Sequence, residues 1–133
     1  MQIREPSHDE RQLFDLACSA QRTSYHPHSR FRVGAALRTH DGQIHTGTNI
    51  DNASYPVSVC AEVSAVSAAV TQGAKRIETV AVVGEADSVS PCGQCRQLLS
   101  EFATSTTTVV YRWQGEMISV PLTVLLPHGF ELR

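Results

Sequence analysis

The stretch VCAEVSAVSAAV, residues 59–70, has the small apolar residues of a packed helix and carries two ionisable side chains at its start. We expect this helix to run from about Cys60 to Thr71, with Gly73 capping its C-terminal end. Buried thiols are common in proteins, whereas a buried carboxylate is rare unless a partner stabilises it. Cys60 and Glu62 therefore require a partner from elsewhere in the chain.

A second helical pattern offers that partner. The segment SPCGQCRQLLSEFA, residues 90–103, begins with Pro-Cys and continues with apolar residues at helical spacing. Cys92 and Cys95 would lie on one side of the first turn, where free amide donors and the helix dipole favour ionised thiolates. Alone, a Cys-x-x-Cys pair is compatible with a zinc site, a redox pair or chance.

Cys60 favours zinc, because two helix starts that each follow a loop can direct three thiolates at one ion. Three protein ligands leave tetrahedral zinc with one open position, as in catalytic sites, and a water there becomes acidic. Glu62 cannot easily bind the ion that Cys60 holds, but it can take the proton of that water and pass it to a substrate nitrogen. The alternative is a structural zinc site completed by Cys18 or a histidine, although the six histidines show no ligand spacing.

The remaining patterns predict an α/β fold with a mixed sheet in a single domain, residues 1–133. A helix is expected over residues 8–24, capped by Ser7 or Asp9, with Cys18 as a small core side chain. Strands are expected at 31–39 and 44–50, joined by an Asp-Gly turn, and at 77–85, 106–113 and 116–120, before a short helix within 122–130. We expect a parallel strand after each crossover.

Composition narrows the possible functions. The formal net charge is −2, with 41% hydrophobic and 18% charged residues, which gives no bias toward nucleic acids as partners. No stretch approaches the roughly 18 apolar residues of a membrane span. The N-terminal MQIREPSHDER has no apolar core, so we expect no signal peptide and a cytoplasmic location.

At this point the motifs resemble a known family. CAE, residues 60–62, followed by PCGQC, residues 91–95, is similar to the Cys-x-Glu and Pro-Cys-x-x-Cys signature of zinc-dependent nucleobase deaminases. Three further segments narrow the resemblance to the small cytidine deaminases: YHPHSRFRVGAAL (25–37), GTNIDNASY (47–55) and LLPHGF (125–130). The resemblance covers nearly the whole chain.

The resemblance implies a three-layer α/β/α fold with a mixed sheet of about five strands. It implies hydrolytic deamination of cytidine and 2′-deoxycytidine to uridine and 2′-deoxyuridine with release of ammonia, as part of pyrimidine salvage. The implied enzyme is a homotetramer with shared active sites and one zinc ion per chain. Cys60, Cys92 and Cys95 would be the zinc ligands, and Glu62 the proton carrier.

The same resemblance assigns the substrate contacts. Phe31 would line the base pocket, and the backbone of Ala61 would help to read the base. Asn49 and Asp51 would bind ribose hydroxyls, while Phe130 would approach the base from a neighbouring subunit. Plain core packing is the alternative for Phe31 and Phe130, and a turn-stabilising amide is the alternative for Asn49.

Three residues depart from the family pattern. Asp51 stands where a glutamate is usual, His28 replaces a tyrosine, and Val63 replaces an arginine that helps to offset the thiolate charge. Arg96, next to Cys95, becomes the cation expected to hydrogen-bond thiolate sulfur and support the zinc site.

Other functions compete with this one. A deaminase of a cytosine-containing antibiotic such as blasticidin S shares the zinc motifs. A polynucleotide editor would need a basic track for phosphates, which this slightly acidic chain does not suggest. A non-enzymatic structural zinc module is the alternative from another class of protein.

Overall fold

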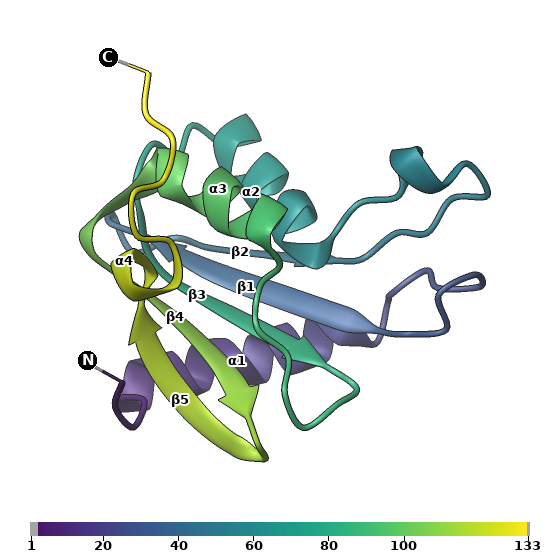
Figure 1. Ribbon diagram of the computed structural model, residues 1–133, viewed down its shortest axis with the longest axis horizontal. Helices are drawn as coiled ribbons and strands as arrows, with labels where there is room; N and C mark the ends of the chain where they lie inside the picture. The colour runs from purple at the N-terminus through teal and green to yellow at the C-terminus, as the bar shows by residue number, and fades with distance from the viewer. Residues whose placement is uncertain (1–2, 133) are drawn as a thin grey trace.

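Five strands form one sheet in the order β2-β1-β3-β4-β5 (Figure 1). The computed structural model describes residues 3–132 of the chain. The strands are β1 (Val33–Thr39), β2 (Ile44–Thr48), β3 (Ile77–Gly84), β4 (Ala103–Trp113) and β5 (Glu116–Pro121). The helices are α1 (His8–Gln21), α2 (Ala61–Thr71), α3 (Gly93–Phe102) and α4 (Leu122–Leu125), with a 3-10 helix η1 (Tyr55–Val57). The prediction of a mixed sheet of about five strands is confirmed.

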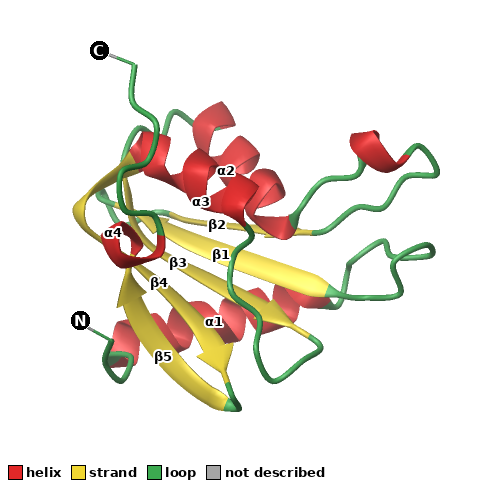
Figure 2. Ribbon diagram, in the orientation of Figure 1, coloured by secondary structure: helices red, strands yellow, loops and turns green. Residues whose placement is uncertain are grey.

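Helices cover both faces of the sheet. α1 packs on one face, and α2 and α3 lie over the other (Figure 2). Consecutive residues of β1 divide between the two layers: Ala36 packs in the cluster that contains Leu13 of α1, and Leu37 packs in the cluster that contains Ala65 of α2. The predicted three-layer α/β/α fold is thus confirmed. None of the described helices is both long and apolar enough to cross a bilayer.

The pairing of β3 agrees with the expectation of a parallel strand after each crossover. β3 runs parallel to β2, the strand before its crossover, yet its hydrogen-bonded neighbours are β1, which is antiparallel to it, and β4, which is parallel. The reason is that the crossover through α2 starts from β2 and passes over β1. β2 and β3 therefore run in the same direction with β1 between them, and the crossover through α3 is the one that joins adjacent parallel strands.

This topology decides where the functional side chains meet. α2 follows the C-terminal end of β2 and α3 follows the C-terminal end of β3, so both helices begin at the same edge of the sheet. β1 begins at this edge too, where Val33 pairs with Gly84. α2 can approach β2 closely because Gly47 has no side chain: a Cβ there would lie 2.3 Å from the backbone nitrogen of Ala65.

Three elements, α1, β1 and β2, are shorter than their sequence patterns suggest. α1 stops short of residue 24 because Tyr25 already pairs with Ile50. β1 begins at Val33 rather than at residue 31, because the side-chain amide of Asn49 donates to the carbonyl of Phe31 at 2.8 Å. Phe31 therefore lies beyond the end of the strand, at the edge where the helices begin.

A buried carboxylate ties the start of α1 to the sheet. Ser7 caps α1 as predicted, and Glu10 completes the capping box by accepting from the Ser7 backbone N–H at 2.8 Å. Glu10 also accepts from Arg4 at 2.7 Å, Thr108 at 2.8 Å and Ser119 at 2.6 Å. Burial by itself would raise the pKa of Glu10, but these hydrogen bonds outweigh it and lower the pKa to about 2.

We expect Glu10→Gln to lower the free energy of unfolding at pH 7 by about 3 kcal/mol. The folded-state pKa of Glu10 lies below the ordinary value of 4.5, so its contribution is present above that value and disappears as pH falls toward 2. Urea unfolding at pH 7 and at pH 3 measures both effects. The control is Asp9→Asn, an exposed acid in the same turn. Equal unfolding energies for Glu10→Gln and wild type at pH 7 would contradict the prediction.

Candidate active site

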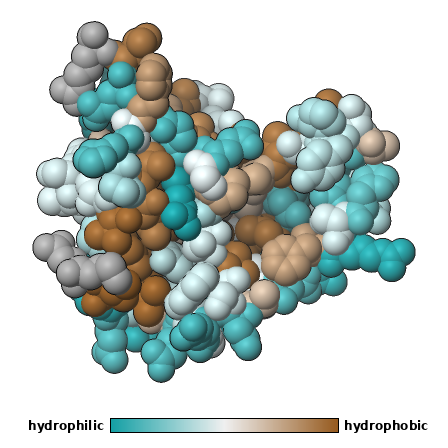
Figure 3. All heavy atoms as spheres, viewed as in Figure 1, coloured by the Kyte–Doolittle hydropathy of each residue, from teal (hydrophilic) through white to brown (hydrophobic). Residues whose placement is uncertain are grey.

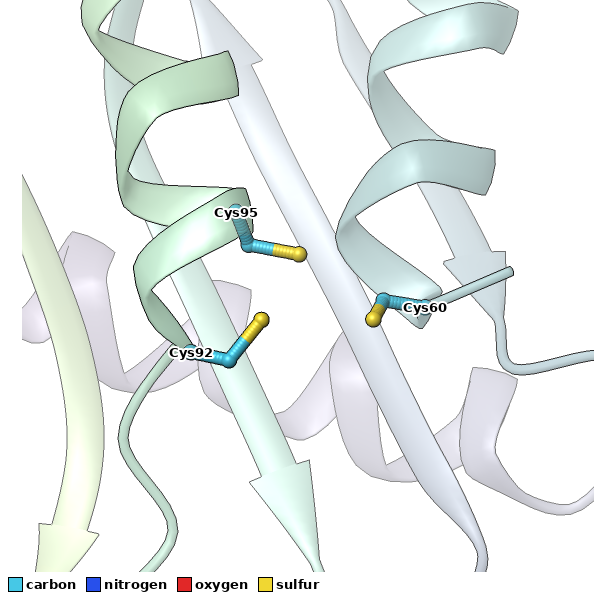
Figure 4. Close-up of side chains that lie close together, drawn as sticks. All are labelled: Cys60, Cys92 and Cys95. Atoms are coloured by element: carbon cyan, nitrogen blue, oxygen red, sulfur yellow. The ribbon is translucent and has the colours of Figure 1, made fainter. Parts of the chain in front are cut away.

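Three cysteines from two helix starts form one cluster. Cys60 is the N-cap of α2, Cys92 is the N-cap of α3, and Cys95 lies in the first turn of α3. Their sulfur atoms all lie within 4.8 Å of one another and point into the space between the two helices (Figure 4). Among residues 3–132, no histidine or carboxylate and no fourth cysteine belongs to this cluster.

The donor set fits zinc. Thiolates are strong zinc ligands, and the two helix N-termini supply positive dipole ends that favour them. A hydrogen bond from Cys95 lowers the pKa of Cys60 to about 6, and the same bond raises the pKa of Cys95. Three protein ligands leave one position of a tetrahedral ion for a non-protein group. The alternative of a structural site closed by Cys18 or a histidine therefore finds no support in the described part of the chain.

Glu62 lies beside this cluster and is nearly inaccessible to solvent, with 4% of its surface exposed. Burial raises the pKa of Glu62 to about 7, and the charge of Cys60 adds to the effect. The first turn of α2 thus carries a carboxylate that holds or releases a proton near neutral pH. A group with this property, two residues from a metal ligand, is suited to general acid and base catalysis.

A cavity of about 600 Å³ opens at the same edge of the sheet. In Figure 3 it appears as a hollow between the body of the molecule and the projecting segment that carries η1. The predicted site residues on its wall are Phe31, Asn49, Asp51, Cys60, Ala61, Glu62 and Cys92. Segments that are far apart in the sequence therefore form one site.

The polar side chains of this wall make hydrogen bonds within the protein. Asn49 accepts from the backbone N–H of Val33 at 2.9 Å and from the Ser24 hydroxyl, and it donates to the Phe31 carbonyl. These bonds are the turn-stabilising role that the sequence left open for Asn49. They use only one of the two hydrogens of its side-chain amide. Asp51, which is 9% exposed, accepts two backbone N–H groups from the segment that precedes β1.

Phe130 does not line the cavity of its own chain. Its side chain is 71% exposed, so plain core packing does not describe it. The backbone of Phe130 is fixed by Gln97 of α3, whose amide donates to the Phe130 carbonyl at 3.0 Å and accepts from its N–H at 3.1 Å. The ring is thus held at the surface by the helix that carries Cys92 and Cys95.

Arg96 makes other contacts than the sequence suggested. Its guanidinium donates to the carbonyls of Pro91 at 2.8 Å and Leu125 at 2.9 Å, and to the Ser90 hydroxyl at 3.2 Å. None of the hydrogen bonds described for Arg96 goes to sulfur. Arg96 therefore joins the loop that leads into Cys92 to the C-terminal segment.

Several residues of the cavity wall were not predicted as site residues. Val82 and Val89 form apolar wall, and Gln94 lies at its rim between two zinc-ligand candidates. Val82 lies within the buried strand pattern 77–85, and Gln94 lies inside the Pro-Cys-x-x-Cys motif. Their positions in these two patterns were the signal that could have identified them. Cys18 packs as predicted against the core cluster under α1, on the other face of the sheet.

Comparison with known proteins agrees with this geometry. Residues 7–112 match the family described as the cytidine and deoxycytidylate deaminase zinc-binding region. A cytidine deaminase of Halalkalibacterium halodurans is 39% identical over 124 residues, which is 92% of this chain and 94% of that protein. A blasticidin-S deaminase of Bacillus cereus is 32% identical over 114 residues, covering 79% of this chain and 81% of its own.

A solved structure gives the same result. The crystal structure of cytidine deaminase from Burkholderia pseudomallei superposes with a TM-score of 0.85 at 38% identity, covering 94% of this chain and 100% of the other. The fold, the family match and the cluster of three thiols agree with one another. The chain therefore belongs to the cytidine and deoxycytidylate deaminase family and is a zinc-dependent hydrolase with one zinc ion per chain, and the Cys60, Cys92 and Cys95 cluster is a site compatible with that ion.

Proposed function

We propose that this protein converts cytidine and 2′-deoxycytidine to uridine and 2′-deoxyuridine by hydrolysis, with release of ammonia. The observation that carries the proposal is the buried carboxylate of Glu62 beside the three-thiol cluster, both on the wall of one cavity. We further propose that the protein acts in the cytoplasm, in salvage of pyrimidine nucleosides.

Zinc, when bound by the three thiolates, would supply Lewis acidity that lowers the pKa of a water well below its ordinary value. Glu62 then carries both protons of the water: it takes the first as the water oxygen bonds to C4 of the cytosine ring and gives it to N3, and it takes the second from the C4 hydroxyl and gives it to the amino nitrogen. The bond from C4 to the amino nitrogen breaks, and ammonia leaves. The oxygen that remains on C4 makes the product a uracil nucleoside.

The other wall residues orient the substrate. Phe31 presents an aromatic ring that can pack on the base, and the backbone of Ala61 can hydrogen-bond its edge. Asn49 and Asp51 line the same cavity and would bind the sugar hydroxyls. Asn49 has one amide hydrogen left for this after its bond to the Phe31 carbonyl.

A deaminase of blasticidin S is the second candidate function, because a protein of that name is 32% identical to this chain. Ammonia release from cytidine, 2′-deoxycytidine, 5-methylcytidine, guanine and blasticidin S separates the two. We expect turnover of the first two substrates. Turnover of blasticidin S alone would replace the proposal, and one bound zinc without any turnover would indicate a structural module.

We also propose a homotetramer in which Phe130 completes the active site of a neighbouring subunit. The support is its exposed ring, which lies outside the cavity of its own chain. Phe130→Ala and Glu62→Gln proteins, each with low activity, should regain activity when subunits are exchanged between them, because some sites then receive both intact residues. Masses of the mixed oligomers verify the exchange. Absence of recovery after exchange would show that Phe130 serves its own subunit.

We expect Arg96→Gln to lower zinc affinity or turnover by about 10- to 100-fold. Without the guanidinium, the Pro91 carbonyl loses a bond that fixes the loop before Cys92. Zinc competition with a chelator and steady-state turnover measure the two effects. Arg76→Gln, an exposed arginine before β3, is the control. Unchanged zinc affinity and turnover would contradict the prediction.

Adding Val63→Arg to Arg96→Gln separates charge from geometry. A new cation near the thiolates would restore function if the loss were electrostatic. The contacts of Arg96 go to oxygen atoms of the loop and of the C-terminal segment, so we expect little recovery. Full recovery in the double variant would show instead that charge compensation is the main task of Arg96.

A further inference from the structure

The segment from His26 to Arg32, which we call the 26–32 loop, forms one side of the cavity. His28, Ser29 and Phe31 of this loop all lie on the cavity wall. The loop belongs to no helix or strand, so its shape depends on contacts with other segments. Arg30 has a φ of 55°, a left-handed conformation that costs a non-glycine residue about 1–3 kcal/mol and persists only where the surroundings fix it.

Asp51 supplies two of these contacts. One oxygen of its carboxylate, Oδ2, accepts the backbone N–H of Ser29 at 2.7 Å and the backbone N–H of His28 at 3.0 Å. Hydrogen bonds to a charged acceptor are about twice as strong as neutral ones. The backbone N–H of Asp51 also donates to the Tyr25 carbonyl at 2.8 Å, which fixes Asp51 against the residue just before the loop.

The bonds also affect the ionisation of this carboxyl. The Ser29 amide, followed by the other groups of the loop, lowers the pKa of Asp51, so the charged acceptor is present at neutral pH. Asn49 fixes the other end of the loop through the Phe31 carbonyl and the Val33 N–H. Phe31 is therefore held between two anchored points.

We infer that Asp51 is a positioning residue for Phe31, which anchors the 26–32 loop and so contributes to recognition of the base as well as of the sugar. This inference rests on the proposed function, since it assumes a cytosine nucleoside in the cavity. Its physical basis is that Oδ2 already serves two loop amides, so that oxygen is occupied before any sugar arrives.

The test compares two substrates that share a base. 2′,3′-Dideoxycytidine keeps the cytosine and lacks both ring hydroxyls, so it cannot report a sugar hydroxyl contact. We expect Asp51→Ala to lower kcat/KM for dideoxycytidine by a factor of about 10, the loss of roughly one hydrogen bond to a charged group. The factor for cytidine should be at least as large, because cytidine also loses the sugar contact of Asp51. If dideoxycytidine turns over too slowly, its inhibition constant against cytidine replaces kcat/KM.

Two further variants localise the effect. Asp51→Asn keeps an oxygen that can accept both amides, so it should retain more activity than Asp51→Ala. In a Phe31→Ala background, Asp51→Ala should cause no further loss with dideoxycytidine, because the residue through which it acts is gone. Asp15→Ala, an exposed acid of α1, is the control with wild-type activity.

Hydrogen exchange tests, independently of activity, whether Asp51 anchors the 26–32 loop. We expect the amides of His28 and Ser29 to exchange faster in Asp51→Ala than in wild type or Asp15→Ala, with bound zinc unchanged. A loss seen with cytidine and absent with dideoxycytidine, or unchanged exchange in the 26–32 loop, overturns the inference. If wild type deaminates no cytosine nucleoside, the proposed function fails, while the exchange result still tests the anchor.

Discussion

Glu62→Gln should lower kcat by about 10²- to 10⁴-fold, the range contributed by one general acid and base, while the protein keeps its zinc. Glutamine has nearly the shape of glutamate and can still hydrogen-bond, but it cannot take up and release a proton near neutral pH. KM should change little, because the cavity wall keeps its form. Ammonia release and zinc content per chain are the measurements.

The burial of Glu62 adds an independent readout. A carboxylate that is 4% exposed is costly to keep in a folded chain, so its neutral replacement should not lower the unfolding temperature. Glu101→Gln, an exposed glutamate on α3, serves as the matched control with wild-type turnover. Near-normal kcat in Glu62→Gln with zinc retained would show that another group moves the protons.

Much of the fold follows from local patterns in the sequence. The apolar residues of β1 and the small apolar residues of α2 predict one strand and one helix correctly, although β1 is buried on both faces, between α1 and α2. The neighbour of β3 could not be predicted in the same way. Whether a crossover returns to the adjacent strand or passes over it depends on the packing of the whole sheet.

The site shows the same division between local and tertiary information. The spacing of Cys92 and Cys95 indicates their common direction, because three residues make about one helical turn. The spacing of residues could not predict the partners of Arg96, because a long side chain can reach either sulfur or several carbonyls. One of the carbonyls that Arg96 binds, that of Leu125, belongs to the C-terminal segment. The hydrogen-bond partners of Asp51 could not be predicted either, since they depend on how the 26–32 loop folds back toward this residue.

Cys95→Ala should remove most of the zinc and lower turnover by more than about 1,000-fold, since water at its ordinary pKa is a poor nucleophile at pH 7. Cys95 is fully buried, so no solvent-exposed side chain can take its place as a ligand. Cys92→Ala should have the same effect, and because Cys92 is exposed, that variant tests ligation with little disturbance of the core.

Cys18→Ala is the matched control, because this half-buried thiol packs under α1 on the opposite face of the sheet. It should keep one zinc per chain and wild-type turnover, with at most a modest loss of stability from the smaller side chain. Elemental analysis and thiol titration count metal and cysteines in all three variants. Cys92→Ala and Cys95→Ala could instead both keep stoichiometric zinc and full activity, while Cys18→Ala loses them. The metal would then lie outside the cluster of three thiols, and the meeting of the first turns of α2 and α3 would need a different explanation.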